Sequence, residues 1–167
     1  MAVVSQDTYL FHGTVEENLR FGKPTATVAE LQSAARNANA HEFIQKLPEG
    51  YATVIGERGV KLSGGQRQLL AFARALAFDP DILVLDEATA NVDTETEVWI
   101  QNAIDRLLSE RTSLVIAHRI STIRKADQII AMHKGELREK GTHDELMAAR
   151  GIYHRLHRLQ YASENEK

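Results

Sequence analysis

Three short apolar runs of the chain each end abruptly in polar residues. The runs share this pattern at widely separated places: residues 2–5 before Gln6, residues 82–85 before Asp86 and Glu87, and residues 113–117 before His118. Continuous apolar runs of this length are typical of strands covered on both faces, as in the parallel sheet of an α/β fold. Ligands of such sheets bind at the carboxyl ends of the strands. We therefore expect these polar residues to line one sheet edge, although each alone is explained equally well as a residue that merely ends a strand.

Residues 61–66 (KLSGGQ) precede the clearest helical pattern. Apolar residues follow at helical spacing: Leu69, Phe72, Ala73, Leu76 and Ala77. The pattern predicts a helix that buries one face and begins near Ser63, with Ser63 and Gln66 as a capping box. A helix cap does not require Gly64 and Gly65. Glycine has no side chain, so a ligand can approach its backbone closely. The N-terminus of a helix also attracts anions. These residues alone leave both a helix cap and a phosphate site open.

The remaining elements follow from periodicity and capping signals. Helices are predicted at residues 28–40, 41–47, 142–150 and 152–160, and after Asp93, which by itself is also a good N-cap. Thr142 and Glu145 form a second candidate capping box. Residues 127–132 predict a strand, and Lys134-Gly135 a turn. The largely helical region 14–46, broken at Gly22-Lys23-Pro24, indicates a helical insertion in the chain order of the sheet.

Composition narrows the class of protein. With 167 residues, of which 43% are hydrophobic and 26% charged, the chain is long enough for one cored domain. The net charge is −3 and no stretch concentrates Lys and Arg, so a nucleic-acid partner is not expected. The absence of cysteine excludes disulfides and thiolate metal sites. Because no apolar run approaches the length of a membrane span and no leader pattern follows Met1, we expect a soluble chain.

Together these segments resemble the ATP-binding cassette (ABC) ATPase domain of membrane transporters, most closely of the exporter type. Five motifs carry the resemblance: the Q-loop glutamine Gln6, the signature LSGGQ at residues 62–66, the Walker B strand ILVLDE at residues 82–87, the D-loop ANVD at residues 90–93, and the switch histidine His118. In addition, GERG at residues 56–59 is similar to the loop by which exporters touch their membrane domains. The resemblance extends from Ala2 to about Tyr161.

The resemblance implies a partial P-loop NTPase (RecA-like) α/β fold, with a parallel sheet and an inserted α-helical signature subdomain. Within one partial ABC ATPase domain, residues 1–167, three parts are expected: the Q-loop strand at residues 1–9, the helical subdomain with the signature at residues 10–78, and the core lobe with Walker B, D-loop, switch histidine and C-terminal helices at residues 79–167.

The resemblance also implies ATP and Mg²⁺ as cofactors and assigns a role to each site residue. In a head-to-tail dimer, the signature would bind the γ-phosphate of ATP held by a second ABC ATPase domain, through Ser63, Gly64, Gly65 and Gln66. Asp86 would hold Mg²⁺ through water, with Gln6 beside the metal. Glu87 would polarise the attacking water as the catalytic base, assisted by His118. Gln6 and His118 would sense the γ-phosphate, and Asp93 would couple the two sites.

One motif of the family is missing. The phosphate-binding pattern G-x-x-x-x-G-K-[ST] does not occur, because Gly22-Lys23, the only Gly-Lys pair, is followed by Pro24. The chain therefore resembles the C-terminal three-fifths of a cassette. In the family's sheet, the P-loop strand lies between the strand that ends at His118 and the strand at residues 128–132. We accordingly expect two unpaired strand edges, exposed apolar side chains at Val84, Val115 and Ile129 or their neighbours, and an oligomer.

The function implied is ATP binding and hydrolysis that powers transmembrane export, at the cytoplasmic side of the cell membrane and with the exporter's transmembrane domain as partner. Without a P-loop the chain alone is expected to be inactive. Two alternatives remain open: the C-lobe of a DNA-repair or chromosome-segregation ABC-type ATPase, and a non-catalytic relic that binds a partner. The absence of heptads and of a basic stripe disfavours the first. The second keeps the same motifs, and the transported substrate is not determined by the sequence.

Overall fold

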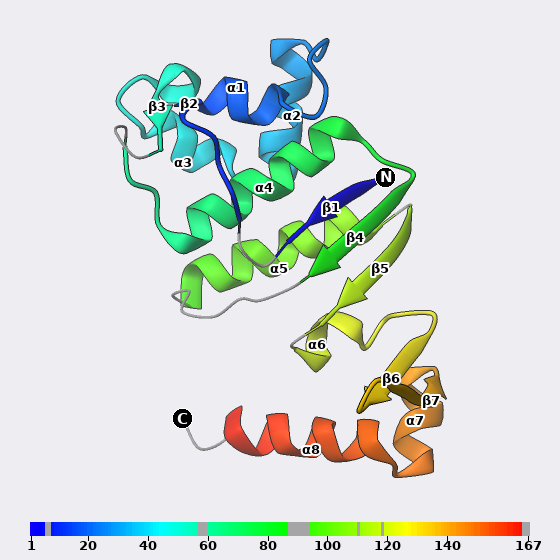
Figure 1. Cartoon of the computed structure of the whole chain (residues 1–167). Coiled ribbons are helices and arrows are strands. Elements are labelled where there is room, and N and C mark those ends of the chain that lie inside the picture. Colours follow the sequence, from blue (N-terminus) through cyan, green and yellow to red (C-terminus); the bar gives the residue numbers. More distant parts are fainter. Residues whose placement is uncertain (6–7, 57–59, 87–93, 110, 118, 165–167) are drawn as a thin grey trace. The chain divides into compact units, whose positions relative to one another are not determined.

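The computed structural model describes residues 1–167 except 6–7, 57–59, 87–93, 110, 118 and 165–167 (Figure 1). The chain divides into two compact units, Met1–Ile116 and Ala117–Lys167. Among the described residues, no helix combines the length and the apolar character that crossing a membrane requires.

The first unit combines a parallel sheet with a group of helices. The sheet has the order β1-β4-β5, and the strands are β1 (Ala2–Val4), β4 (Ile82–Asp86) and β5 (Thr112–Ile116). A separate antiparallel pair is formed by β2 (Gly13–Thr14) and β3 (Val54–Ile55). The helices are α1 (Val15–Arg20), α2 (Val28–Asn37), α3 (His41–Gln45), the 3₁₀ turn η1 (Gly50–Ala52), α4 (Gly64–Phe78) and α5 (Thr94–Leu108). The α/β class with a parallel sheet, predicted from the apolar runs, is confirmed.

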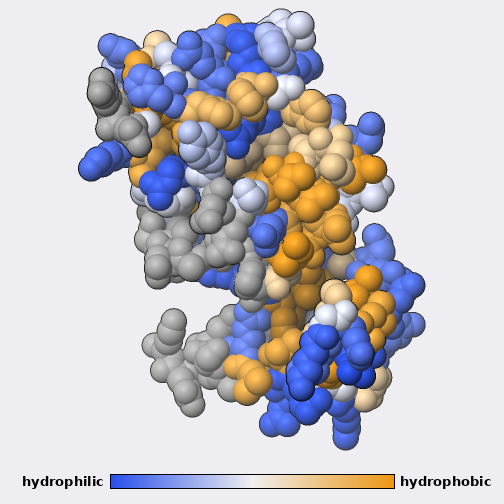
Figure 2. Space-filling view, in the orientation of Figure 1, coloured by the Kyte–Doolittle hydropathy of each residue, from blue (hydrophilic) through white to orange (hydrophobic). Residues whose placement is uncertain are grey.

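The two faces of this sheet differ in their surroundings. Because alternate residues of a strand point to opposite faces, Val4, Leu83 and Leu85 share one face, where they are buried in the helical core. The opposite face carries apolar side chains that are between 45% and 60% exposed: Val3, Ile82, Leu114 and Ile116. They form an apolar area over β1, β4 and β5 in Figure 2. One sheet face therefore has little cover from the described residues.

Of the expected exposed apolar residues, it is the neighbours of the three named positions that are exposed. Val84 and Val115 are only half-buried and Ile129 is buried, whereas their neighbours in the strands are the exposed residues: Leu114, Ile116, Ile130 and Met132. The reason is the alternation along each strand, which places Val115 beside Leu85 on the covered face.

The outer edges of β5 and β6 are among those that have no strand beside them in the described part of the chain. β5 pairs with β4 alone, and β6 (Ile129–His133) pairs with β7 (Glu136–Gly141) alone. These are the edges that the missing P-loop strand was expected to leave open. Unpaired edges present rows of backbone donors and acceptors to any strand that can reach them.

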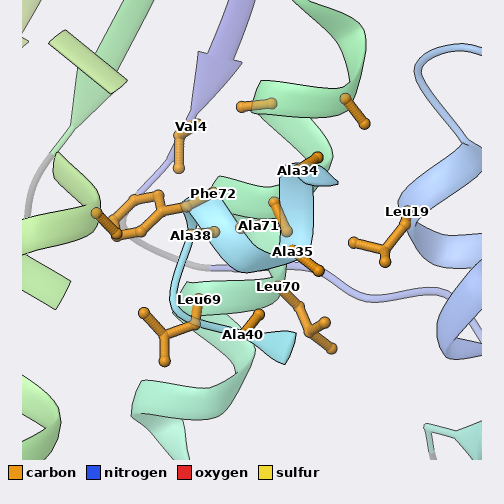
Figure 3. Packing of buried hydrophobic residues seen from close by; sticks show 14 of the residues in the cluster. Val4, Leu19, Ala34, Ala35, Ala38, Ala40, Leu69, Leu70, Ala71 and Phe72 are labelled. Atoms are coloured by element: carbon orange, nitrogen blue, oxygen red, sulfur yellow. The ribbon is translucent and has the colours of Figure 1, made fainter. Parts of the chain in front are cut away.

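Helix α4 lies at the centre of the first unit. Its residues Leu69–Ala73 are all buried, so this central part of the helix is enclosed on every side, whereas Arg67 and Phe78 nearer its ends are exposed. It contacts α1, α2, α5 and β1. Figure 3 shows Ala34 and Ala35 of α2 close to Ala71 and Leu70 of α4. The small side chains of α2 allow the two helices to pack closely.

Four helices begin with complete capping boxes. The boxes predicted at Ser63/Gln66 and Thr142/Glu145 are confirmed. Two further boxes, at Thr14/Glu17 and Thr27/Glu30, start α1 and α2 and were not predicted from the sequence. In each box, the Thr or Ser oxygen accepts from the N3 backbone N–H and the N3 side chain accepts from the cap N–H.

The second unit contains α6 (Ile120–Ile123), β6, β7, α7 (His143–Ala149) and α8 (Ile152–Glu164). β6 and β7 form an antiparallel hairpin across the predicted turn, where Lys134 and Gly135 both have positive φ values, 53° and 78°. A separate small core joins these elements: Ile120, Ile129, Ala131, Leu146 and Tyr153. The Tyr153 hydroxyl lies 2.8 Å from Nδ1 of His143 and ties α8 to α7.

The uncovered sheet face and the free edge of β5 predict self-association. We expect the chain to form a dimer or larger oligomer, because exposed apolar area and unpaired backbone groups are both satisfied by a second molecule. Gel filtration with light scattering should show a concentration-dependent mass. Leu114→Lys, on the open face, should shift the population toward monomer, whereas Val98→Lys, at a similarly exposed site on α5, should not. A concentration-independent monomer with a sharp, high-temperature melt contradicts this account.

The start of α2 predicts a pH effect. The Lys23 ammonium, 2.9 Å from Glu30 Oε1, together with the backbone and side chain of Thr27, lowers the pKa of Glu30 from 4.5 to about 2. Since the folded pKa lies below the unfolded one, this stabilisation is fully present above about pH 4.5 and is lost as the pH falls toward 2. An NMR titration should show that Lys23→Met raises the pKa of Glu30, while Lys46→Met leaves it unchanged. An unaltered pKa in Lys23→Met would refute the assignment.

Candidate functional site

The N-terminus of α4 combines a closed capping box with two unused backbone donors. The Ser63 N–H donates to Gln66 Oε1 at 3.0 Å, and the Gln66 N–H donates to Ser63 Oγ at 3.1 Å. The N–H groups of Gly64 and Gly65 have no acceptor among the described residues. A helix cap and a phosphate site are therefore compatible at these residues. The cap satisfies the N–H groups of Ser63 and Gln66 and leaves the glycine N–H groups for a ligand.

The surroundings of these donors favour an anion. The site begins a helix of 15 residues, whose N-terminus carries about half a positive charge. Arg67 lies in the first turns of α4 and is fixed by a hydrogen bond of 2.7 Å from its guanidinium to the Leu62 carbonyl, and exposed Lys61 precedes the helix. A Cβ atom at Gly64 would meet nothing closer than an Arg67 nitrogen at 3.9 Å, so the approach to the backbone is open.

Asp86 is the second predicted site residue that the structure places. It is half-buried at the carboxyl end of β4, opposite Ile116 of β5. The register sets Val4, Leu85 and Val115 side by side, so the three strands end at one edge of the sheet. The strand ends therefore converge as the sequence predicted.

The other predicted site residues lie outside the described residues: Gln6, Glu87, Asp93 and His118. The same holds for residues 57–59 of the GERG loop. Their assignments stay predictions that rest on the motifs. The structure brings together the strands that lead to three of these residues, but it does not place their side chains.

Asp86 has the chemistry that Mg²⁺ prefers. A carboxylate oxygen is a hard ligand, and Mg²⁺ usually keeps several waters while binding one or two carboxylates. The described residues contain no cluster of three or more His, Asp or Glu side chains that could enclose an ion. The Asp86 carboxylate at the sheet edge can supply one such oxygen ligand.

Sequence reasoning missed an exposed aromatic cluster on the first unit. The rings of Tyr9 and Phe11 lie 5.2 Å apart, and those of Phe11 and Phe21 lie 4.3 Å apart. Tyr9 is 69% exposed and Phe21 is 61% exposed. Exposed groups of aromatic residues are common at protein interfaces. The signal in the sequence was the pair of aromatic residues within residues 9–11, which belong to none of the five motifs.

A buried asparagine holds the aromatic cluster in place. Asn18 accepts from the Phe11 N–H at 2.8 Å and donates to the carbonyls of Phe11 and Thr14 at 3.0 and 2.9 Å. The Arg74 guanidinium donates to the Tyr9 carbonyl at 3.2 Å, and burial lowers the pKa of Arg74. The segment is thus tied to α1 and α4 by backbone contacts, and its rings are presented to solvent on a fixed support.

Comparisons with known proteins agree with this geometry. A family model described as "ABC transporter" matches residues 1–90. The chain is 52% identical over 164 residues to an ATP-dependent lipid A-core flippase of Syntrophus aciditrophicus, and 54% identical over 166 residues to an uncharacterized ABC transporter ATP-binding protein of Bacillus subtilis. A bacterial Atm1-family ABC exporter solved with ATP bound matches with a TM-score of 0.84 and 43% identity.

The matches cover nearly all of this chain and a small part of each relative. They span 98% of the chain for the flippase, 99% for the Bacillus protein and 95% for the exporter structure. Conversely, the chain spans 27% of the flippase, 28% of the Bacillus protein and 28% of the exporter chain. The resemblance drawn from the five motifs is confirmed at the level of the family and the fold.

The geometry at Ser63 predicts two separable effects of one substitution. Ser63→Ala should cost about 1 kcal/mol of stability through loss of the cap, measured by urea denaturation. Thr142→Ala, which removes the equivalent cap of α7, should cost a similar amount and serves as the control. In a cassette dimer that turns over ATP, Ser63→Ala should also lower turnover, whereas Thr142→Ala should not. Equal ATP turnover in the two variants would mean that Ser63 acts only as a helix cap and does not bind phosphate.

Proposed function

Because this chain belongs to the ABC transporter family, we propose that it is part of the ATP-binding domain of an exporter and that ATP hydrolysis by the complete domain powers transport. The observation that carries the proposal is the N-terminus of α4, where the N–H groups of Gly64 and Gly65 have no acceptor among the described residues and the approach to Gly64 is open, whereas Gly65 is buried. Their ligand is the γ-phosphate of ATP held by a second ABC ATPase domain.

The remaining roles follow the motif assignments. Asp86 holds Mg²⁺ through water, and Gln6 stands beside the metal and the γ-phosphate. Glu87 accepts the proton of the attacking water, which requires a base within hydrogen-bond reach. His118 contacts the γ-phosphate, and Asp93 links the two nucleotide sites. Support comes from the common edge at which β1, β4 and β5 end, directly before three of these motifs.

The domain division follows from the same assignment. Residues 1–9 supply the Q-loop strand, residues 10–78 the helical subdomain with the signature, and residues 79–167 the core lobe. The helices α1 to α4 lie in the middle segment and pack on one another, which supports its treatment as one subdomain.

The partners are a second ABC ATPase domain and the transmembrane domain of the exporter, which would place this chain at the cytoplasmic side of the membrane. The supported aromatic cluster of Tyr9, Phe11 and Phe21 is the surface that we assign to the transmembrane partner. It is exposed, apolar and rigid, as a permanent protein interface requires.

ATP turnover tests the proposal. The isolated chain should hydrolyse ATP negligibly, because no P-loop positions the β- and γ-phosphates and positioning supplies most of the catalysis. When the chain is joined to an N-terminal lobe with a P-loop, hydrolysis should appear. Glu87→Gln should then slow it by about 10²- to 10⁴-fold and leave ATP binding nearly intact.

Two results would contradict this function. Steady phosphate release by the isolated chain, abolished by Glu87→Gln, would mean that the chain positions ATP by other means. Turnover at the parental rate in the joined Glu87→Gln variant would make Glu87 an ordinary residue at a strand end. An ATP titration of the joined chain separates an active domain from a relic, since a relic binds its partner without turnover.

A further inference from the structure

A surface cleft of about 320 Å³ opens between the end of α2, the start of α3 and helix α5. Its walls come from two distant parts of the sequence: Arg36, Asn39, His41, Glu42, Trp99 and Arg106. None of these residues belongs to the motifs assigned to ATP. A hollow of this size is sufficient for a small molecule.

Arg106 is held in a fixed position at the wall of this cleft. One of its terminal nitrogens donates to the carbonyls of Arg36 and Asn37 at 3.3 and 3.0 Å, and to Asn39 Oδ1 at 3.2 Å. This nitrogen caps the C-terminus of α2. The other terminal nitrogen and Nε have no acceptor among the described residues. One terminal nitrogen of the guanidinium therefore fixes its orientation, and the other terminal nitrogen and Nε can still donate to a ligand.

Asn39 completes this wall, and both the nitrogen and the oxygen of its side-chain amide contact the protein. It adopts the left-handed conformation, with φ of 56°, just after α2. Its amide nitrogen donates to the Trp99 carbonyl at 2.9 Å, and its amide oxygen accepts from Arg106. The asparagine thus joins the α2–α3 turn to α5, and it contributes structure and not a ligand group.

The groups that remain are mostly donors and positive charges. The Arg36 side chain is exposed and makes no hydrogen bond or ion pair in the described part of the chain. Burial raises the pKa of Tyr51 to about 12, so its hydroxyl keeps its proton and lies 2.8 Å from His41 Nδ1, which leaves Nε2 of the imidazole available. Glu42 is the one carboxylate that lines the cleft.

We propose that this cleft binds a small oxyanion, the phosphate or carboxylate group of a small molecule, between Arg36 and Arg106. Two guanidinium groups suit such a ligand, since each can donate two parallel hydrogen bonds to an oxyanion. Because the orientation of Arg106 is already fixed, the entropic cost of immobilising its side chain on binding is smaller. The Trp99 ring, 38% exposed, lies beside the site and offers a flat apolar wall to the rest of the ligand.

Trp99 is the only tryptophan of the chain, so its fluorescence reports on this cleft directly. The full chain would be titrated with inorganic phosphate, pyrophosphate and citrate at constant ionic strength, with chloride as the blank. We expect a saturable change with at least one oxyanion and none with chloride. Saturation by phosphate or pyrophosphate alone assigns a phosphate group, and saturation by citrate alone assigns a carboxylate.

Three charge variants sharpen the test. Arg36→Gln should weaken binding by about 10-fold, because it removes a charged donor whose side chain has no structural partner in the described residues. Glu42→Gln should tighten binding roughly two- to fivefold by removing the opposing charge. Lys46→Gln, an equal loss of positive charge at an exposed site outside the lining, should leave affinity unchanged. Far-ultraviolet circular dichroism checks that each variant folds.

The proposal is overturned if no oxyanion gives a saturable signal, or if Lys46→Gln weakens binding as much as Arg36→Gln, since attraction would then be diffuse. Failure of Glu42→Gln to tighten binding also counts against it. The readout involves no ATP hydrolysis, and the inference does not rest on the proposed transport function. The two can therefore fail separately.

Discussion

The burial of the central part of helix α4 on every side is the constraint on which the first unit depends. Residues Leu69–Ala73 all lie in the core, and the helix contacts α1, α2, α5 and β1. A helix packed in this way cannot rotate or slide without opening cavities, each of which costs several kcal/mol for a large side chain such as Phe72. Its N-terminus, where the free glycine N–H groups lie, is fixed as a consequence. Its C-terminus ends at Asp79 in the left-handed conformation and leads into β4, which carries Asp86.

Polar contacts do what apolar packing cannot, because they set the ends and turns of the helices. Asn18 ties the aromatic segment to α1, and Arg106 with Asn39 ties the end of α2 to α5. The capping box at Ser63 satisfies the backbone N–H groups of Ser63 and Gln66 and leaves those of Gly64 and Gly65 without an acceptor in the described residues. Each device leaves functional groups at the surface: exposed rings, guanidinium edges and backbone N–H groups. In these places the groups that make the supporting contacts differ from the groups that are left exposed.

The sheet has one face covered by the helical core and one face that is exposed in the described part of the chain. Val4, Leu83 and Leu85 pack into the helical core, whereas Val3 and Leu114 on the other face are each 60% exposed. An α/β sheet is ordinarily covered by helices on both faces. The chain spans 27% to 28% of the relatives it matches, so the larger part of those proteins has no counterpart in it. The open face and the free edge of β5 lie where additional elements would pack.

The sequence by itself determined the strands β1, β4, β5 and β6 and the capping boxes at Ser63 and Thr142, because these depend on residues within a few positions of one another. The order of five short motifs along the chain indicated the family. Tertiary structure decided which alternate residues of a strand are exposed, as Leu114 is and Val115 is not. It also decided that the central residues of α4, Leu69–Ala73, are enclosed on all sides, although the local period indicated a single face. The cleft between Arg36 and Arg106 joins residues 70 positions apart. Local periodicity records which side chains share a face, but only packing against distant segments decides what covers that face.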